Sequence, residues 1–153
     1  MRTRELFLFL PAAVVVAADQ LTKVWIRSFL AYGHSVPEDG PVRLTHIDNS
    51  GAAFGIMANQ GILITITAIA GIAALLLYYR YPVFNIPSFQ VALGMALGGA
   101  VGNLIDRIRF GRVTDFIDFR VWPIFNLADS AIVVGMGLLG LFLMIRKEPG
   151  TPG

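Results

Sequence analysis

The chain has 153 residues, of which 56% are hydrophobic and only 14% are charged, and its formal net charge is +2. Because soluble globular domains carry about a quarter of charged residues, this composition excludes a soluble globule and indicates an integral membrane protein. The sequence has no cysteine, which excludes disulfides, thiol catalysis and thiolate metal sites. The length predicts a single membrane domain over residues 1–153, and the small, dispersed net charge does not indicate a nucleic-acid partner.

The first apolar segment follows two arginines and permits two interpretations. Residues 6–18 resemble the apolar core of a signal peptide. Alternatively, a helix continues through Asp19 and Lys23 to Trp25, which is long enough to span a bilayer. Asp19 and Lys23 are four residues apart, so they share one helix face and can form an ion pair. We expect the spanning helix, over about residues 6–25, with Trp25 at the membrane interface.

Residues 28–48 are polar and are interrupted by glycine and proline, which predicts a loop outside the bilayer. The alternation of apolar and polar side chains over residues 42–45 predicts a short strand at its end. Residues 49–55 read Asn-Ser-Gly-Ala-Ala-Phe-Gly. This small, uncharged segment is interpreted as a turn back into the membrane, and a loop that holds a substrate backbone is the alternative.

Three more apolar runs predict spanning helices over about residues 61–79, 85–105 and 127–145. The third of the four spans contains glycines at helical spacing (Gly94, Gly98, Gly99 and Gly102), which favours close helix packing over a ligand role. The tail, residues 148–153, is rich in proline and glycine and is predicted to be disordered. The predicted fold is therefore an all-α membrane protein with four transmembrane helices.

Four spans place both termini on one side of the membrane and gather the polar residues of the span ends on the other side. The side opposite the termini, here called the active face, collects Asp19, Lys23, Asn49, Ser50, Asn103, Asp106, Arg107, Asp115, Asp118, Asn126 and Asp129. Ionisable residues near a bilayer are costly, so their concentration indicates a functional site. Lysine and arginine are similarly frequent on both sides, so the positive-inside rule does not decide the orientation.

The sequence lacks the residue motifs that several kinds of catalysis require. There is no His-Glu-x-x-His, no Gly-x-Ser-x-Gly and no glycine-rich phosphate loop, so neither a zinc protease nor a serine hydrolase is indicated, and no metal or cofactor is expected. Carboxylates remain. Two that lie close together share one proton, so that one activates water and the other protonates a substrate carbonyl, as in aspartyl proteases. A small ion-coupled transporter with an aspartate relay is the alternative.

The spacing of the carboxylates leaves the choice of the pair open. Asp129 follows Asn126 by three residues, a pattern that also suits the cap of a helix. Asp106 precedes Arg107, which could neutralise it. Asp115 and Asp118 fall on opposite faces of any strand, and spacing alone ranks neither above the other.

Five stretches nevertheless resemble one family in order along the chain. They are Asp-Gln-Leu-Thr-Lys at 19–23, Asn-Ser-Gly-Ala-Ala-Phe-Gly at 49–55, Gly-Gly-Ala-Val-Gly-Asn-Leu-Ile-Asp-Arg at 98–107, Val-Thr-Asp-Phe at 113–116 and Phe-Asn-Leu-Ala-Asp-Ser at 125–130. In these stretches the chain resembles lipoprotein signal peptidase, the bacterial signal peptidase II family of membrane aspartyl proteases. The similarity covers nearly all of the chain outside the tail.

The resemblance implies a role for each candidate residue. It implies that Asp115 and Asp129 form the catalytic dyad and that Asp118 has no catalytic role. The residues that it implies to line the substrate site or hold the dyad are Asn49, Gly51, Asn103, Arg107, Asn126 and Ala128. The residues that it implies to support the fold are Asp19, Lys23 and Asp106.

The resemblance also implies a substrate and an orientation. The substrate would be a prolipoprotein whose signal-peptide cysteine carries diacylglycerol, and cleavage would fall just before that cysteine. The active face would lie outside the bacterial cytoplasmic membrane, with both termini in the cytoplasm and a small β-sheet cradle formed mainly by the first loop. We expect a monomer whose partners are these substrates and membrane lipids.

Overall fold

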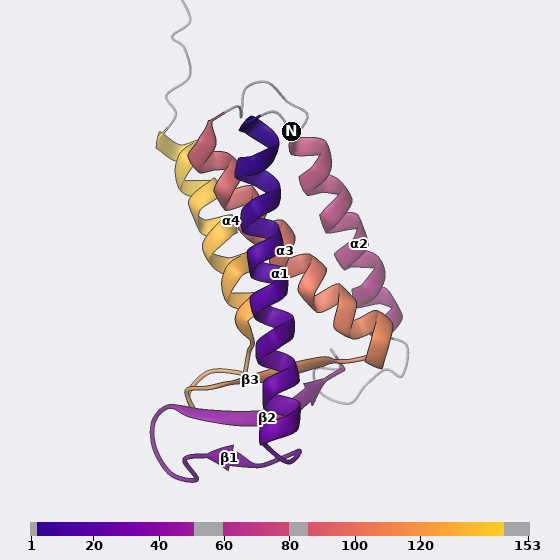
Figure 1. Ribbon diagram of the computed structural model, residues 1–153, viewed down its shortest axis with the longest axis vertical. Helices are drawn as coiled ribbons and strands as arrows, with labels where there is room; N and C mark the ends of the chain where they lie inside the picture. Colours follow the sequence, from indigo (N-terminus) through magenta and orange to yellow (C-terminus); the bar gives the residue numbers. More distant parts are fainter. Residues whose placement is uncertain (1–2, 51–59, 80–85, 146–153) are drawn as a thin grey trace, which may run out of the picture.

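The computed structural model describes residues 3–50, 60–79 and 86–145. In this part of the chain, helices form a bundle and a small sheet lies across one of its ends (Figure 1). The helices are α1 (Thr3–Phe29), α2 (Gln60–Tyr79), α3 (Pro87–Phe110) and α4 (Leu127–Ile145), and the strands are β1 (Ser35–Val36), β2 (Arg43–Asn49) and β3 (Val113–Asp118). The first residues of α1 and the last residues of α4 lie at the end opposite the sheet.

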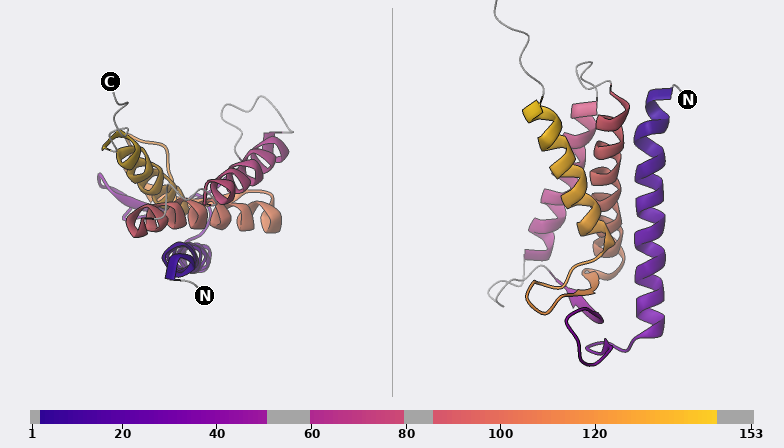
Figure 2. Two further views of the ribbon diagram at one scale, coloured as in Figure 1. Left: turned by 90° about the horizontal axis from the view of Figure 1, so that it is seen from above. Right: turned by 90° about the vertical axis from the view of Figure 1, so that its left-hand side faces the viewer.

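Helix α3 is the centre of the bundle. Seen along the bundle, α1 lies on one side of α3, while α2 and α4 diverge from its other side (Figure 2). A buried apolar cluster joins α1, α3 and α4 far from the sheet, and it contains Leu8, Phe89, Ala92, Leu93 and Leu139. The bundle therefore packs around one central helix.

Glycines on α3 permit this close packing. A Cβ added to Gly98 would lie 2.6 Å from the carbonyl oxygen of Ala12, and a Cβ added to Gly102 would lie 2.6 Å from Oδ2 of Asp19. Both distances are shorter than van der Waals contact, so any larger residue would push α1 away from α3. The predicted packing role of these glycines is confirmed.

The sheet is antiparallel, in the order β1-β2-β3. Strand β2 pairs with β3 so that Arg43 lies opposite Asp118 and Ile47 opposite Asp115, with an irregularity between Leu44 and Ile47. The first loop thus supplies two strands and the chain between α3 and α4 supplies the third, which agrees with the predicted small sheet formed mainly by the first loop. The predicted strand at 42–45 is correct in place, but β2 continues to Asn49 because β3 offers it a partner.

Two helices extend beyond their predicted limits. Helix α1 continues past Trp25 to Phe29, since no glycine or proline occurs between Trp25 and Gly33. Helix α3 continues past residue 105 to Phe110 and ends at Gly111, whose φ of 71° gives the left-handed cap from which its N–H bonds to the carbonyl of Arg107. Asp106 and Arg107 therefore lie within a helix rather than in the loop after it.

Three helices in the described residues are long and apolar enough to cross a membrane: Glu5–Phe29, Pro87–Phe110 and Leu127–Ile145. Helix α2 contributes a shorter apolar stretch, Thr65–Leu77. Large apolar side chains face outward on these helices, among them Leu21 at 70% exposure and Val133 at 71%. Such a surface is stable in lipid and not in water.

The packing of α1 on α3 yields the first prediction. Gly98→Ala should lower the thermal unfolding midpoint in detergent, with a loss of about 1–3 kcal/mol from overpacking against Ala12. Gly137 on α4 is the matched control, because an added Cβ there meets no atom within 4 Å. Gly137→Ala should leave the midpoint unchanged or raise it. Equal midpoints for the two variants would contradict the inferred contact.

Candidate active site

Strand β3 and the start of α4 are joined where the chain turns back on itself. Ile117 donates its N–H to the carbonyl of Phe125 at 2.8 Å, and Phe125 returns a bond to the carbonyl of Ile117 at 3.2 Å. This pairing lays the residues before α4 beside β3. It therefore brings Asp115, in the strand, and Asp129, in the helix, to the same place.

Asp115 is almost completely buried, with 1% of its surface exposed. Its Oδ1 accepts a hydrogen bond of 2.6 Å from Nδ2 of Asn126, and its Oδ2 accepts one of 3.0 Å from Nδ2 of Asn49. Both oxygens of the carboxyl group are thus held by amides from two different elements.

Asp129 lies in the first turn of α4. Asn126 precedes the helix as its cap, with Oδ1 accepting the N–H of Asp129 at 2.9 Å, and Oδ2 of Asp129 accepts the N–H of Asn126 at 3.2 Å. This is a reciprocal capping arrangement. Oδ1 of Asp129 accepts a further bond of 2.7 Å from Nδ2 of Asn103 on α3. The capping role and the site role considered for these residues therefore coexist.

Two asparagines link the aspartates. Nδ2 of Asn126 donates to Asp115 and, at 3.1 Å, to Oδ1 of Asn103, while Nδ2 of Asn103 donates to Asp129. Each amide oxygen accepts a bond of its own, which fixes the direction in which each NH2 group points. The two carboxyl groups are consequently held in a defined mutual orientation by amide donors.

Burial raises the pKa of Asp115 from 3.8 to about 6. The hydrogen bonds from Asn49 and Asn126 and the charge of Lys23 lower this pKa, the charge of Asp129 raises it, and the value of about 6 is the net result. A carboxyl with such a pKa exchanges its proton near neutral pH. The pair can therefore hold a proton on one member and a charge on the other.

A buried charged cluster supports this arrangement from behind. Lys23 lies 2.9 Å from Oδ2 of Asp19 and 3.4 Å from Oδ2 of Asp106, and all three side chains are fully buried. Nζ of Lys23 also donates to Oδ1 of Asn103 at 2.9 Å, and Oδ1 of Asp19 accepts the N–H of Ala128 at 3.0 Å. The ion pair predicted from the spacing of Asp19 and Lys23 is present.

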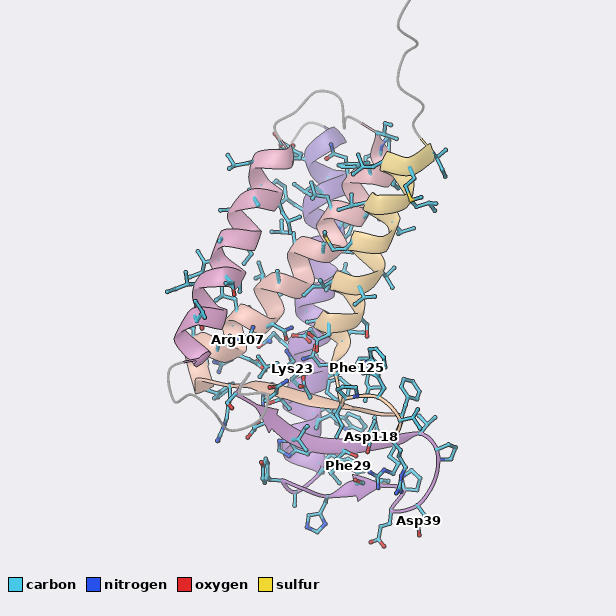
Figure 3. The ribbon with its side chains drawn as sticks, turned by 180° about the vertical axis from the view of Figure 1, so that it is seen from behind. Lys23, Phe29, Asp39, Arg107, Asp118 and Phe125 are labelled. Carbon is cyan, nitrogen blue, oxygen red and sulfur yellow. The ribbon has the colours of Figure 1, made fainter. Side chains whose placement is uncertain are left out.

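The partners of Asp106 differ from the sequence-based interpretation. Within the described residues, its ion pairs are with Lys23 and, at 3.7 Å, with Arg27, both on α1, and not with the adjacent Arg107. Arg107 instead approaches the carbonyl of Asn103 at 3.5 Å. Figure 3 shows Arg107 and Lys23 at the end of the bundle beside the sheet.

Asp118 belongs to a different part of the sheet. Its Oδ2 accepts hydrogen bonds from Arg43 and from Oγ1 of Thr45 at 2.9 Å, and its Oδ1 accepts the N–H of Arg120 at 2.7 Å. The bonds from Arg43, above all, lower the pKa of Asp118. This carboxylate is occupied by structural bonds and stays ionised.

Asp129 borders two cavities. One, of about 550 Å³, lies between α2, α3 and α4 and is bordered by Asn103, Arg107 and Asp129 at one end and by apolar residues elsewhere. The other, of about 420 Å³, lies beside Trp122, Phe125 and Val133. A molecule in either space reaches the carboxyl group of Asp129.

The structure brings most of the predicted residues together. Asn49, Asn103, Asn126, Asp115 and Asp129 are connected by hydrogen bonds, and Ala128 is fully buried on the supporting cluster. Ser50 is exposed at the end of β2, and Gly51 lies outside the described residues.

Two residues of the supporting cluster were not identified from the sequence. Gln20 donates to Asp19, to Asp106 and to the carbonyl of Gly102, and Thr114 donates its N–H to Asp106. Both stand next to residues that were identified from the sequence. The contacts of Gln20 join segments more than 80 positions apart. The contact of Thr114 depends on the turn between α3 and β3.

The chain is similar to known proteins over most of its length. The family model for signal peptidase (SPase) II matches residues 11–145. The lipoprotein signal peptidase of Halothermothrix orenii is 40% identical over 93% of this chain and 98% of its own length. That of Moorella thermoacetica is 47% identical over 84% of this chain and 86% of its own length. A bacterial membrane enzyme solved by the in meso method at 1.9 Å resolution is 34% identical with a TM-score of 0.82, over 90% of this chain and 92% of that chain.

Fold, buried aspartates and similarities together define an aspartic-type peptidase of the bacterial membrane. The chain belongs to the signal peptidase II family. The resemblance drawn from the sequence motifs is thereby confirmed, and an enzyme of this family replaces the transporter alternative.

The raised pKa of Asp115 yields a prediction with a defined sign. Because the folded-state pKa lies above the usual 3.8, the protonated form favours the folded state. The stability that this proton contributes is therefore greatest below pH about 4 and is lost as the pH rises through about 6. Asp115→Asn should abolish this pH dependence of stability. Thermal unfolding midpoints of wild type and variant, measured at a series of pH values, would test it.

Asp118→Asn provides the control, because its pKa is shifted in the opposite direction. Its ionised form stabilises the fold above its usual pKa, and this contribution is lost on acidification. The advantage of wild type over Asp118→Asn should therefore shrink as the pH falls. Parallel pH profiles for wild type and Asp115→Asn would contradict the raised pKa.

The buried cluster yields a third prediction. Lys23→Met should destabilise the protein by about 3–5 kcal/mol, because Asp19 and Asp106 lose a fully buried counter-charge. Adding Asp19→Asn should recover part of that loss, since one uncompensated carboxylate is then removed. Chemical or thermal unfolding of the single and double variants measures the coupling, and strictly additive losses would refute it.

Proposed function

We propose that Asp115 and Asp129 are the catalytic pair of this peptidase. The observation that carries the proposal is the chain of amide hydrogen bonds through Asn126 and Asn103, which links the two carboxyl groups. The raised pKa of Asp115 supports it, because a shared proton requires one carboxyl to hold its proton at a higher pH than a free aspartic acid does. The pair needs no metal for this chemistry.

In the proposed reaction, the ionised member of the pair takes a proton from water as the water attacks the peptide carbonyl. The protonated member gives its proton to the carbonyl oxygen, so that a neutral tetrahedral diol forms. In the collapse of the diol, the member of the pair that is now ionised takes a proton from one diol hydroxyl. The other member gives its proton to the leaving nitrogen, and the C–N bond breaks. Asn103 and Asn126 orient the carboxylates throughout, which reduces reorganisation during the reaction.

The proposed substrate is a prolipoprotein whose signal-peptide cysteine carries diacylglycerol, cleaved just before that cysteine. Support comes from the name shared by the relatives, lipoprotein signal peptidase. It also comes from the mostly apolar cavity of about 550 Å³ that meets Asp129 from the side of the membrane-spanning helices. Arg107 borders this cavity and is proposed, with Asn49 and Gly51, to hold the substrate backbone.

We further propose that α2 is a fourth transmembrane helix and that residues 1–153 form one monomeric membrane domain. The sheet and the aspartates would lie on the extracytoplasmic face, with both termini in the cytoplasm. The position of the ends of α1 and α4 opposite the sheet supports this orientation of the termini (Figure 1). Asp19, Lys23, Asp106 and Ala128 would have supporting roles.

Cleavage of a diacylglyceryl-modified prolipoprotein by purified enzyme tests the catalytic pair. Asp115→Asn and Asp129→Asn should each lower the rate on the order of 100-fold or more, because each removes one proton-transfer group. Asp118→Asn removes a buried carboxylate of the same sheet and should retain cleavage per folded molecule. A correctly folded Asp115→Asn or Asp129→Asn enzyme that cuts near the wild-type rate would refute the two-aspartate mechanism.

A further inference from the structure

A separate cavity of about 480 Å³ lies on the opposite side of β3 from the aspartate pair. It is bounded by the end of α1, the end of α3 and the strands β2 and β3. The residues that matter for its chemistry are Arg27, Asp48, Phe110, Arg112 and Thr114. Neither Asp115 nor Asp129 lines it, so it is not part of the proposed catalytic site.

Two arginines enter this cavity with unused donors. Nη1 of Arg27 donates to Oγ1 of Thr114 at 2.9 Å, and Nε of Arg112 lies 3.1 Å from Oδ2 of Asp48. A guanidinium has five N–H donors on three nitrogens. Within the described part of the chain, the other two nitrogens of each group have no hydrogen-bond partner. These donors are available to an acceptor inside the cavity.

A third arginine lies beside the same cavity. The ring of Phe110 is 4.8 Å from the guanidinium carbon of Arg27 and 5.2 Å from that of Arg109. Arg109 is exposed and has no ion pair with any described residue. Phe110 itself is 45% exposed, so an apolar surface adjoins the cationic groups.

The charges around the cavity do not cancel. The charged residues that line the cavity are the cationic Arg27 and Arg112 and the anionic Asp48. One formal positive charge remains. It is the charge that a single monoanionic phosphodiester neutralises.

The position of the cavity relative to the bilayer indicates where such a phosphodiester would come from. The membrane-spanning segments of α1 and α3 end at Phe29 and Phe110, and the cavity lies at these two ends. Trp25 and Phe29 stack at 5.1 Å between ring centroids and are both about half exposed, as aromatic residues at a membrane interface are. Phospholipid headgroups occupy this depth on every side of the protein.

We propose that this cavity binds the phosphate of one anionic phospholipid, with Arg27 and Arg112 as its direct ligands and Arg109 above it. Guanidinium groups match phosphate oxygens in geometry and charge, and basic pockets between transmembrane helices select anionic headgroups. The exposed ring of Phe110 accommodates the glycerol and the first acyl carbons. The site is independent of the aspartate pair and goes beyond the proposed peptidase reaction.

Native mass spectrometry of the full chain in detergent tests this proposal with phosphatidylglycerol and phosphatidylcholine of the same acyl chains. Wild type should retain one phosphatidylglycerol in preference to phosphatidylcholine. The double variant Arg109→Gln/Arg112→Gln should weaken that binding roughly tenfold or more, because one direct ligand of the phosphate and one neighbouring positive charge are lost. Arg120→Glu lowers the net charge by the same amount at an exposed residue that does not line the cavity, and it should leave the binding unchanged.

Three results would overturn the proposal. Equal retention of the two lipids would show that no anionic headgroup is selected, and equal weakening in the control variant would show general surface attraction. Displacement of the lipid by millimolar inorganic phosphate would assign the site to free phosphate instead. The single variant Arg109→Gln breaks no ion pair of the described residues. It should also bind phosphatidylglycerol more weakly than wild type, and it serves if the double variant does not fold.

The same variants separate this site from the peptidase reaction. In detergent without added phospholipid, Arg109→Gln/Arg112→Gln should cleave prolipoprotein at the wild-type rate, since neither side chain pairs with Asp115 or Asp129. Asp115→Asn should conversely bind phosphatidylglycerol as wild type does. Failure of the catalytic proposal would therefore leave the lipid measurement intact, and loss of lipid binding in Asp115→Asn would contradict the independence of the two sites.

Discussion

The fully buried cluster of Asp19, Lys23 and Asp106 is the constraint on which the rest of the structure depends. A charge in an apolar interior is costly unless its partners lie at fixed distances, so the cluster determines how α1 sits on α3. The small residue Gly102 lets Asp19 approach α3, and Asp19 in turn bonds to the N–H of Ala128 at the start of α4. One ionic cluster thereby fixes the relative positions of three helices.

The geometry of the aspartates follows from the same cluster. Lys23 occupies the amide oxygen of Asn103, so the NH2 group of that residue must point to Asp129. The side-chain oxygen of Asn126 likewise accepts the N–H of Asp129, and its NH2 group donates to Asp115. A displacement of α1 would therefore reach both carboxylates through hydrogen bonds rather than through long-range electrostatics. The orientation of the candidate site therefore depends directly on how the helices pack in this protein.

The sequence predicted those features that depend on local spacing. The interval of four residues between Asp19 and Lys23 predicted their ion pair, and the glycines of α3 predicted close packing. The partner of Asp106 was not predictable in this way, because adjacent residues on a helix point in different directions and the cation comes from α1. Spacing alone could not rank Asp115 and Asp118, which only the family resemblance distinguished. The pairing of β2 with β3 places Arg43 beside Asp118.

Strand β3 separates the two sites by its own pleat. Asp115 faces Asn49 and Asn126, whereas its neighbour Thr114 faces Arg27 and Asp48. Because successive side chains of a strand point to opposite faces, a phosphate bound at Arg27 cannot contact the carboxyl group of Asp115. The backbone of β3 nevertheless belongs to both sites, since the N–H of Thr114 bonds to Asp106 of the buried cluster. A bound headgroup would therefore stabilise the strand that carries Asp115 without entering the chemistry of the aspartate pair.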